Sequence, residues 1–282
     1  MSTPTGQLPR PCRSLAGSVA IVSGAGNQGM GIGNGRAISI LLAEDGASVV
    51  CIDRDLEAAR VTASMIQEEG KGRAIAHYAD VTKDADCAEA VAAALNAFGR
   101  VDILINNVGV IGAKGTAVEV DREEWSACLE INVSSMMLMA KHAIPAMSRN
   151  ETDSGGIRGA IVNMGSVAGL QGGTPSLLYP TSKGAVVNMT RAMAAHHAKD
   201  GIRVNCVCPG MLFTPMMYGG QGGMSTQMRE ARRKRSLLQT EGNAWDAAGA
   251  VRYLSGKESR WITGTVMTVD AGATCASMLS SR

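Results

Sequence analysis

Aromatic residues, net charge and long hydrophobic runs are all low in this sequence. Aromatics make up 3% of the 282 residues, which argues against a stacking platform for single-stranded nucleic acid. A net charge of +2 is too small to favour nucleic acid or an anionic membrane as a partner. No run of about 18 apolar residues occurs, so the sequence predicts no membrane-spanning helix.

Cysteine is present, but not in a framework pattern. The seven cysteines are an odd number, and none of them forms a CxxC pair. This usage is typical of reduced thiols, so we expect a cytoplasmic protein. Cys206 and Cys208 would share one face of a strand, but no second Cys or His pair accompanies them, and the sequence predicts no metal site.

Short β-branched segments alternate with longer segments of helical spacing from residue 19 onward. Such alternation requires a mainly parallel sheet with helices on both faces, because parallel neighbours need a crossover between them. We therefore predict an α/β fold with a doubly wound, Rossmann-type sheet of seven strands. The predicted strands are 19–22, 48–52, 74–78, 103–105, 160–164, 202–207 and 266–269, and the predicted helices are 37–44, 56–69, 85–98, 123–147 and 178–199.

The same pattern predicts one domain. Residues 1–16 contain three prolines and no apolar segment of a signal peptide, so we expect a flexible arm there. Residues 17–282 show no linker that would divide them. Within them, residues 211–242 are rich in Gly and Met, and we expect this segment to form a lid over a ligand site.

The first predicted strand runs directly into a glycine-rich turn between Ser23 and Arg36. A turn of this kind, followed by a helix, lets backbone N–H groups face a pyrophosphate. Asp53 ends the second predicted strand, where a carboxylate accepts hydrogen bonds from an adenosine ribose and repels a 2′-phosphate. The pattern favours NAD over NADP, although Arg54 would offset part of the repulsion.

Four polar residues further along the chain form a candidate reaction centre. Tyr179 and Lys183 are spaced to share one helix face, and a nearby ammonium favours the tyrosinate and so lowers the pKa of a tyrosine. Ser166 follows the fifth predicted strand, where its hydroxyl can bind a substrate oxygen. Asn132 lies in an apolar helical stretch and needs a partner, either water or the backbone at a local bend.

These features come in one order and at mutually consistent spacings. Over roughly residues 17–272 the chain resembles the short-chain dehydrogenase/reductase family. The resemblance implies an NAD(P)-dependent, single-domain enzyme that assembles as a homotetramer or homodimer. The motifs that carry it are the glycine turn, Asp53, Asn106-Asn107-Val108-Gly109, Asn132, Ser166, Tyr179, Lys183 and Pro209-Gly210.

The resemblance also implies a role for each matched residue. Tyr179 looks like the general acid/base, and Lys183 like the residue that lowers its pKa and holds the nicotinamide ribose. Ser166 would orient the substrate oxygen, and Asn132 would hold a water that links Lys183 to solvent. The implied cofactor contacts are Gly24, Gly33, Asn34, Gly35, Asp53 and Arg54, then Asp80 and Val81 at the adenine, Asn107 and Gly109 at the adenosine, and Tyr179, Lys183, Pro209, Gly210, Leu212 and Thr214 at the nicotinamide.

The chain departs from the family pattern at two places. Ser23 replaces the usual Thr, and the glycine turn is several residues longer than usual. Two alignments of the turn remain open, one through Gly33-Asn34-Gly35 and one through Gly31-Ile32-Gly33. Val108 stands where Ala is usual and would crowd the adenosine side slightly.

Two surface features bear on substrate and assembly. Residues 229–235 include five basic side chains, which predict a solvated helix face or, alternatively, a contact for a carboxylate-bearing substrate. The predicted helix 123–147 carries more apolar residues than one buried face needs, which favours an oligomer.

The sequence therefore predicts an NAD-dependent oxidoreductase that transfers a hydride between nicotinamide and a secondary alcohol or ketone. The substrate is expected to be a small molecule with a mostly apolar skeleton, cyclic skeletons included. One alternative is an NADPH-dependent carbonyl reductase of a biosynthetic pathway. The others are a non-redox dehydratase, epimerase or cyclase on the same scaffold, and a nucleotide-sensing binding module.

Overall fold

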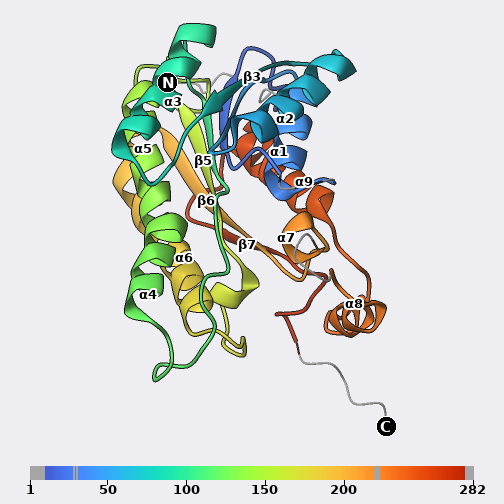
Figure 1. The fold of residues 1–282 in the computed structure, drawn as a ribbon. Helices are drawn as coiled ribbons and strands as arrows, with labels where there is room; N and C mark the ends of the chain where they lie inside the picture. Colours follow the sequence, from blue (N-terminus) through green and yellow to red (C-terminus); the bar gives the residue numbers. More distant parts are fainter. Residues whose placement is uncertain (1–9, 28, 30, 219–222, 277–282) are drawn as a thin grey trace, which may run out of the picture.

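A single parallel sheet forms the centre of the molecule (Figure 1). The computed structural model describes residues 10–27, 29, 31–218 and 223–276. The sheet has seven strands in the order β3-β2-β1-β4-β5-β6-β7, and every pairing is parallel, which confirms the predicted fold class. The strands are β1 (Val19–Ser23), β2 (Ser48–Asp53), β3 (Arg73–Tyr78), β4 (Ile103–Asn106), β5 (Gly159–Met164), β6 (Ile202–Pro209) and β7 (Val266–Val269).

The strand order reverses between β1 and β4. From β1 the chain proceeds outward through β2 and β3, then returns to place β4 on the other side of β1. Crossovers therefore leave the carboxyl ends of β1 and β4 in opposite directions. This switch point is where ligands bind in doubly wound sheets.

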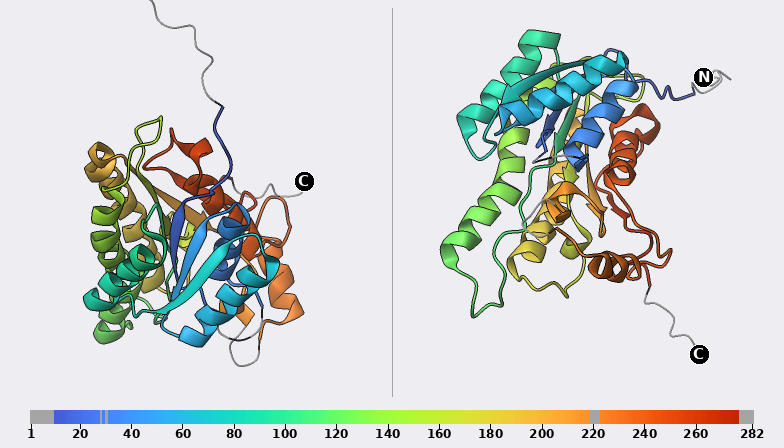
Figure 2. Two further views of the ribbon diagram at one scale, coloured as in Figure 1. Left: turned by 90° about the horizontal axis from the view of Figure 1, so that it is seen from above. Right: turned by 45° about the vertical axis from the view of Figure 1, so that its right-hand side comes forward.

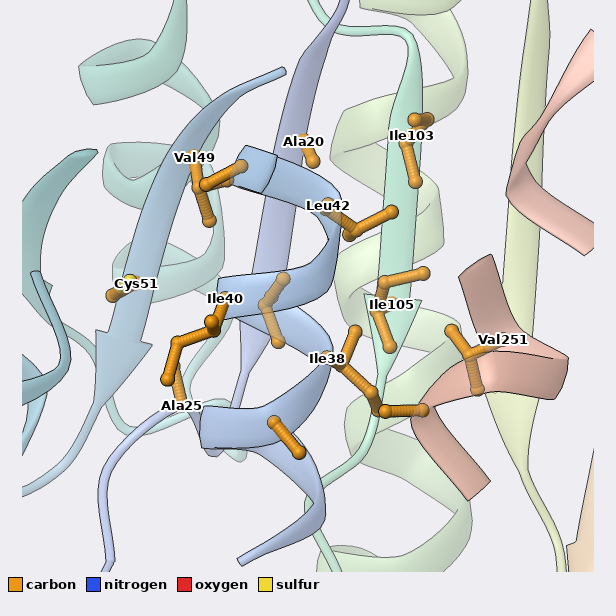
Figure 3. Packing of buried hydrophobic residues seen from close by; sticks show 14 of the residues in the cluster. Ala20, Ala25, Ile38, Ile40, Leu42, Val49, Cys51, Ile103, Ile105 and Val251 are labelled. Carbon is orange, nitrogen blue, oxygen red and sulfur yellow. The ribbon is translucent and has the colours of Figure 1, made fainter. Parts of the chain in front are cut away.

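Helices cover both faces of the sheet (Figures 1 and 2). One core cluster joins α1, α2 and α9 to the sheet, and the other joins α3, α5 and α6 to the opposite face. Figure 3 shows Ile38, Ile40 and Leu42 of α1 among side chains of β1, β2 and β4, with Val251 of α9 beside them. The helices are α1 (Asn34–Glu44), α2 (Leu56–Glu69), α3 (Asp84–Phe98), α4 (Arg122–Leu129), α5 (Ser135–Met147), α6 (Leu178–His197), α7 (Pro215–Tyr218), α8 (Thr226–Arg233) and α9 (Ala244–Ser255).

Helix α9 was not among the predicted helices. It begins with a capping box, in which the Asn243 side chain accepts from Trp245 N and the Asp246 carboxylate accepts from Asn243 N at 2.7 Å. An Asn followed three residues later by an acidic residue is a recognisable helix start, so the signal was present in the sequence. The predicted lid, residues 211–242, contains the short helices α7 and α8.

The predicted long helix 123–147 is interrupted. A π-helical turn over Glu130–Ser134 separates α4 from α5. A π turn holds one extra residue per turn and turns side chains out of the α-helical register. The buried residue of this turn is Asn132, whose side chain is directed toward α6 and the loop after β4.

Packing begins before the predicted end of the N-terminal arm. Residues 1–9 lie outside the described part of the chain. Leu15 is 2% exposed in the core, and its N–H donates to Asp45 O at 2.8 Å. Because this apolar side chain is buried, the packed chain starts at Leu15 rather than after Ala16. Among the described residues, no helix is long and apolar enough to cross a membrane.

A line of buried amides fixes α6 to the sheet. Asn106 Nδ2 donates to Asn163 Oδ1 at 2.9 Å, and Asn163 Nδ2 donates to Thr190 Oγ1 at 3.0 Å. These bonds connect β4, β5 and α6 in the core, where an unmade hydrogen bond is costly. They set the position of the helix that carries Tyr179 and Lys183.

We expect Asn163→Ala to lower the free energy of unfolding by about 2 kcal/mol, because it removes one hydrogen bond each from the buried amide of Asn106 and the buried hydroxyl of Thr190. Urea unfolding followed by circular dichroism measures the change. Asn96→Ala, on the exposed face of α3, serves as the control and is expected to change stability little. Equal effects of the two substitutions would contradict a structural role for the buried line.

Candidate active site

The ends of β1 and β4 are joined by side chains. Ser23 Oγ donates to Ile105 O at 3.1 Å and accepts from Asn107 N at 3.0 Å. Asn107 Nδ2 in turn donates to Ser23 O and Gly24 O at 3.2 and 3.1 Å. Ser23 therefore supplies the hydroxyl that Thr usually supplies. Asn107, which we expected to touch adenosine, holds the glycine turn against β4.

The glycine turn closes against the start of α1. Helix α1 begins at Asn34 after Gly33, and a Cβ on Gly35 would collide with the carbonyl oxygen of Gly24. The structure thus places Gly33, Asn34 and Gly35 at the helix N-terminus, while Gly31 lies in the loop that precedes it. Val108 packs beside Gly24, with its Cγ2 3.2 Å from where a Cβ of Gly24 would be.

Two side chains that were not predicted as site residues hold the lengthened turn in place. Arg36 Nη1 and Asn27 Nδ2 both donate to Gly31 O, at 2.8 and 3.2 Å. Arg36 is 5% exposed and also donates through Nε to Thr62 Oγ1 at 3.0 Å. A buried arginine near the start of a helix needs such acceptors. The position of Arg36 next to the apolar residues of α1 is the signal that could have predicted its role.

Asp53 lies at the mouth of this turn. Its Oδ2 accepts from Gly26 N and its Oδ1 from Asp55 N, both at 3.0 Å. A Cβ on Gly26 would come within 2.8 Å of Oδ2, so glycine is needed for the carboxylate to lie this close. Arg54, the next residue, is exposed.

Asp80 and Val81 follow β3 at the same edge of the sheet, where the carboxyl ends of the strands lie. Burial alone would raise the pKa of Asp80, but hydrogen bonds from Thr82 N and Oγ1 outweigh it and lower the pKa, with Lys83 and Arg54 adding to the effect. The Val81 side chain is 5% exposed and belongs to the core. Only the backbone of Val81 is therefore available to contact an adenine.

Lys183 is buried in the candidate reaction centre. It is 4% exposed, and its Nζ donates to Met164 O at 2.9 Å. A Cβ on Gly109 would lie 3.1 Å from Nζ, so Gly109 adjoins this ammonium, whereas we expected it on the adenosine side. Burial lowers the pKa of Lys183 from its ordinary 10.5 to about 8, because desolvation disfavours the charged form.

Tyr179 stands one helical turn before Lys183 on α6. Burial raises the pKa of its phenol above the ordinary value, and a hydrogen bond with Ser166 opposes this only in part. We expected the ammonium to lower this pKa, and for the protein alone that expectation is wrong. The Lys183 Nζ lies 5.9 Å from the ring centroid and donates to Met164 O, and desolvation of the phenol is the largest cause of the raised pKa.

Asn132 spans the space between the π turn and α6. Its Oδ1 accepts from Val110 N at 2.8 Å, and its Nδ2 donates to Val110 O at 2.9 Å and to Ser182 Oγ at 3.0 Å. The partner that a buried amide requires is therefore the backbone of Val110, three residues after Asn107. This bond pair fixes the loop that passes Lys183.

Ser166 rests on a small sulfur cluster. Cys206 and Cys208 of β6 are fully buried, with their Sγ atoms 3.7 Å apart. A Cβ on Gly165 would lie 2.7 Å from both sulfurs, so only glycine lets β5 turn here and deliver Ser166. The Ser166 Oγ accepts from Ala168 N at 3.1 Å, which orients the hydroxyl at the start of the following 3-10 turn.

The segment after β6 closes the remaining side of the site. A Cβ on Gly210 would lie 2.7 Å from Asp270 Cβ, and both Leu212 and Thr214 are 7% exposed. A Cβ on Gly31 would collide with the hydroxyl of Tyr218 in α7, so the lengthened glycine turn touches the predicted lid. The structure thus brings Gly109, Asn132, Ser166, Tyr179 and Lys183 together, and separately Gly24, Gly35, Asp53 and Asn107.

Comparisons with known proteins agree with this architecture. The family model described as enoyl-(acyl carrier protein) reductase matches residues 24–274. Among curated proteins, meso-2,3-butanediol dehydrogenase of Serratia marcescens is 32% identical over 92% of this chain and 95% of its own. 2-(S)-hydroxypropyl-CoM dehydrogenase 3 of Xanthobacter autotrophicus is 35% identical over 87% of this chain and 94% of its own.

A solved structure resembles the chain over its length. It belongs to a protein from Burkholderia xenovorans assigned to the short-chain dehydrogenases/reductases, and it superposes with a TM-score of 0.84 at 37% identity. The match covers 94% of this chain and 98% of the other.

The buried ammonium predicts a stability effect that depends on pH. Since the pKa of Lys183 is about 8 in the folded protein and near 10.5 when unfolded, the folded state carries the cost of the buried charge below pH 8 and loses it as pH rises. We expect Lys183→Met to raise the free energy of unfolding by about 2 kcal/mol at pH 7, and this advantage to shrink by about 2 kcal/mol at pH 10.

Urea unfolding at the two pH values measures the difference. Lys199→Met, on an exposed stretch after α6, removes the same charge without the burial and should show neither effect. An advantage of Lys183→Met that stayed constant from pH 7 to pH 10 would contradict the buried-charge account.

Proposed function

The chain belongs to the short-chain dehydrogenase/reductase family of oxidoreductases, and on that premise we propose that it is an NAD-dependent dehydrogenase of secondary alcohols. The observation that carries this proposal is the group formed by the half-buried Tyr179 and the buried Ser166 and Lys183 beside the switch point of the sheet. A hydroxyl, a phenol and an ammonium grouped at such a place supply what hydride transfer to a nicotinamide requires of a protein.

The residues at the switch point suit a nicotinamide dinucleotide. Helix α1 presents its N-terminus to the glycine turn, where backbone N–H groups have no partner within the helix. Asn34 Oδ1 is buried there without a hydrogen-bond partner in the described chain. We assign the pyrophosphate to Gly33, Asn34 and Gly35, and the nicotinamide end to Lys183 and the segment from Pro209 to Thr214.

The choice of NAD rests on Asp53. Its carboxylate is fixed by Gly26 N and Asp55 N beside the glycine turn, where the adenosine ribose would lie. A carboxylate held there accepts the ribose hydroxyls and repels a 2′-phosphate. Arg54, the next residue, is exposed and acts on the carboxylate of Asp80.

The chemistry assigned to the protein is proton transfer and orientation. When bound, the nicotinamide supplies the hydride acceptor, and its positive charge favours the phenolate. Tyr179 Oη takes the hydroxyl proton of the alcohol during oxidation and returns it during reduction. Ser166 Oγ donates a hydrogen bond to the substrate oxygen, and Lys183, held by Met164 O, adds positive charge beside the phenol.

The substrate is proposed to be a secondary alcohol on a mostly apolar skeleton. The two curated relatives are named for secondary alcohols, meso-2,3-butanediol and 2-(S)-hydroxypropyl-CoM. Phe213 and Tyr218 pack at 4.7 Å between centroids in the lid, with the Arg229 guanidinium 4.0 Å from the Phe213 centroid. Five buried free thiols suit a reducing, cytoplasmic location, and the 48% exposed Met137 on α5 suits a homotetramer or homodimer.

Tyr179→Phe is expected to lower kcat for alcohol oxidation at least about 100-fold, because the proton acceptor is lost while the ring remains. Binding of NADH, followed by fluorescence titration, should stay within about threefold of the wild type. Tyr253→Phe on α9 is the control and should leave kcat unchanged. Substantial turnover by Tyr179→Phe would remove the tyrosine from the proton transfer.

We expect the wild type to prefer NAD over NADP by more than about tenfold in kcat/KM, and Asp53→Ala to abolish most of that preference. The preference is read from initial rates at 340 nm with each cofactor. Glu57→Ala removes an exposed negative charge nearby and should keep the preference. Equal wild-type rates with both cofactors would favour the NADPH-dependent reductase instead.

A further inference from the structure

A small hollow beside the lid is lined by two arginines. Arg232 and Arg235 border it together with Met211, Leu212 and Asp270. Met211 and Leu212 directly follow Pro209-Gly210, so the hollow adjoins the segment that we assign to the nicotinamide end. Arg232 Nη2 donates to Leu212 O at 3.3 Å, which holds the guanidinium at this place.

The basic residues of this region divide into two groups. Arg229 pairs with Glu241, while Arg233 and Lys234 both pair with Glu230. Arg232 and Arg235 form no ion pair with any residue in the described part of the chain. The two guanidiniums that border the hollow are therefore the ones that make no ion pair, although the negative charge of Glu241 acts on Arg232.

The charge balance inside the hollow favours an anion. Arg232 is half-buried, and its pKa is lowered by burial and by the neighbouring charge of Arg235. Asp270 also borders the hollow, but its carboxylate is engaged by Gly272 N at 2.9 Å, Thr274 N at 2.9 Å and Thr274 Oγ1 at 2.6 Å. The carboxylate oxygens of Asp270 thus bind their own turn. In the described part of the chain Arg232 makes one side-chain hydrogen bond and Arg235 none, so both guanidiniums keep N–H donors for an added anion.

The rim of the hollow is conformationally strained. Among the described residues other than glycine, Gln239 and Ala271 are the two with positive φ, at 49° and 50°. They lie on adjoining segments, because Leu238 N donates to Ala271 O at 3.2 Å. Left-handed conformations of such residues cost free energy and persist where the surrounding structure enforces a particular shape.

We propose that the substrate carries an anionic group of carboxylate size at the end remote from the reacting alcohol, and that Arg232 and Arg235 bind it. This inference rests on the proposed function, which it deepens by naming the substrate class. Two guanidiniums can hold one anion through several charge-assisted hydrogen bonds.

The first test measures binding without turnover. Cyclohexanecarboxylate and cyclohexanecarboxamide, which differ in charge but little in shape, are titrated calorimetrically into the NADH-saturated protein. We expect the carboxylate to bind at least about tenfold more tightly. Because no hydride is transferred, this measurement reports on the arginines even if every alcohol fails as a substrate.

The second test uses variants with a matched control. Arg235 is exposed and makes no hydrogen bond that the fold needs among the described residues, so Arg235→Met should fold normally and reduce the preference for the carboxylate to about threefold or less. Arg232→Met should do the same but also loses the bond to Leu212 O. Lys234→Met removes one positive charge from the same helix end and should keep the wild-type preference.

The third test compares turnover of 4-hydroxycyclohexanecarboxylate with that of its methyl ester and NAD. We expect kcat/KM to favour the acid, mainly through KM, and Arg235→Met to lower kcat/KM for the acid alone. Equal binding of carboxylate and carboxamide would overturn the proposal, and so would a loss of preference in Lys234→Met as large as in Arg235→Met. Tight carboxylate binding with no oxidation of any alcohol would contradict the proposed function and leave the anion site standing.

Discussion

The burial of the Lys183 ammonium is the constraint on which the rest of the site depends. A charged amine inside the protein is tolerated only where an acceptor and close packing compensate it, and here Met164 O is the acceptor. Gly109 leaves room for the ammonium, and the bonds of Asn132 to Val110 hold the loop that passes it. Three segments far apart in the sequence are thus fixed around one charge.

Close packing also fixes the positions of the neighbouring strands. Gly165 and the two thiols of Cys206 and Cys208 form a junction in which no further atom fits, and this junction sets where Ser166 emerges. At the other side, Gly24 and Gly35 meet backbone to backbone and bring α1 against β1. Close contact between small residues, more than any single strong bond, positions the groups that we assign to hydride transfer.

Much of this fold could be predicted from the sequence, because β-branched runs between helical segments leave few arrangements open. Helix α9 was missed because its start was read as the end of an irregular segment. The pKa direction of Tyr179 was wrong, since spacing on a helix reports proximity but not burial. Arg36 and Asn27 were missed because their partner is a backbone carbonyl, Gly31 O, which no side-chain pattern reveals.

The π-helical turn at Glu130–Ser134 has a consequence for sequence change in this region. The turn accommodates its extra residue locally, so deleting one residue there would restore ordinary α-helical winding while α4 and α5 keep their places. Met139 and Met147, which are fully buried, would stay against the sheet. A deletion would instead change the direction of the Asn132 side chain and so break its two bonds to the backbone of Val110.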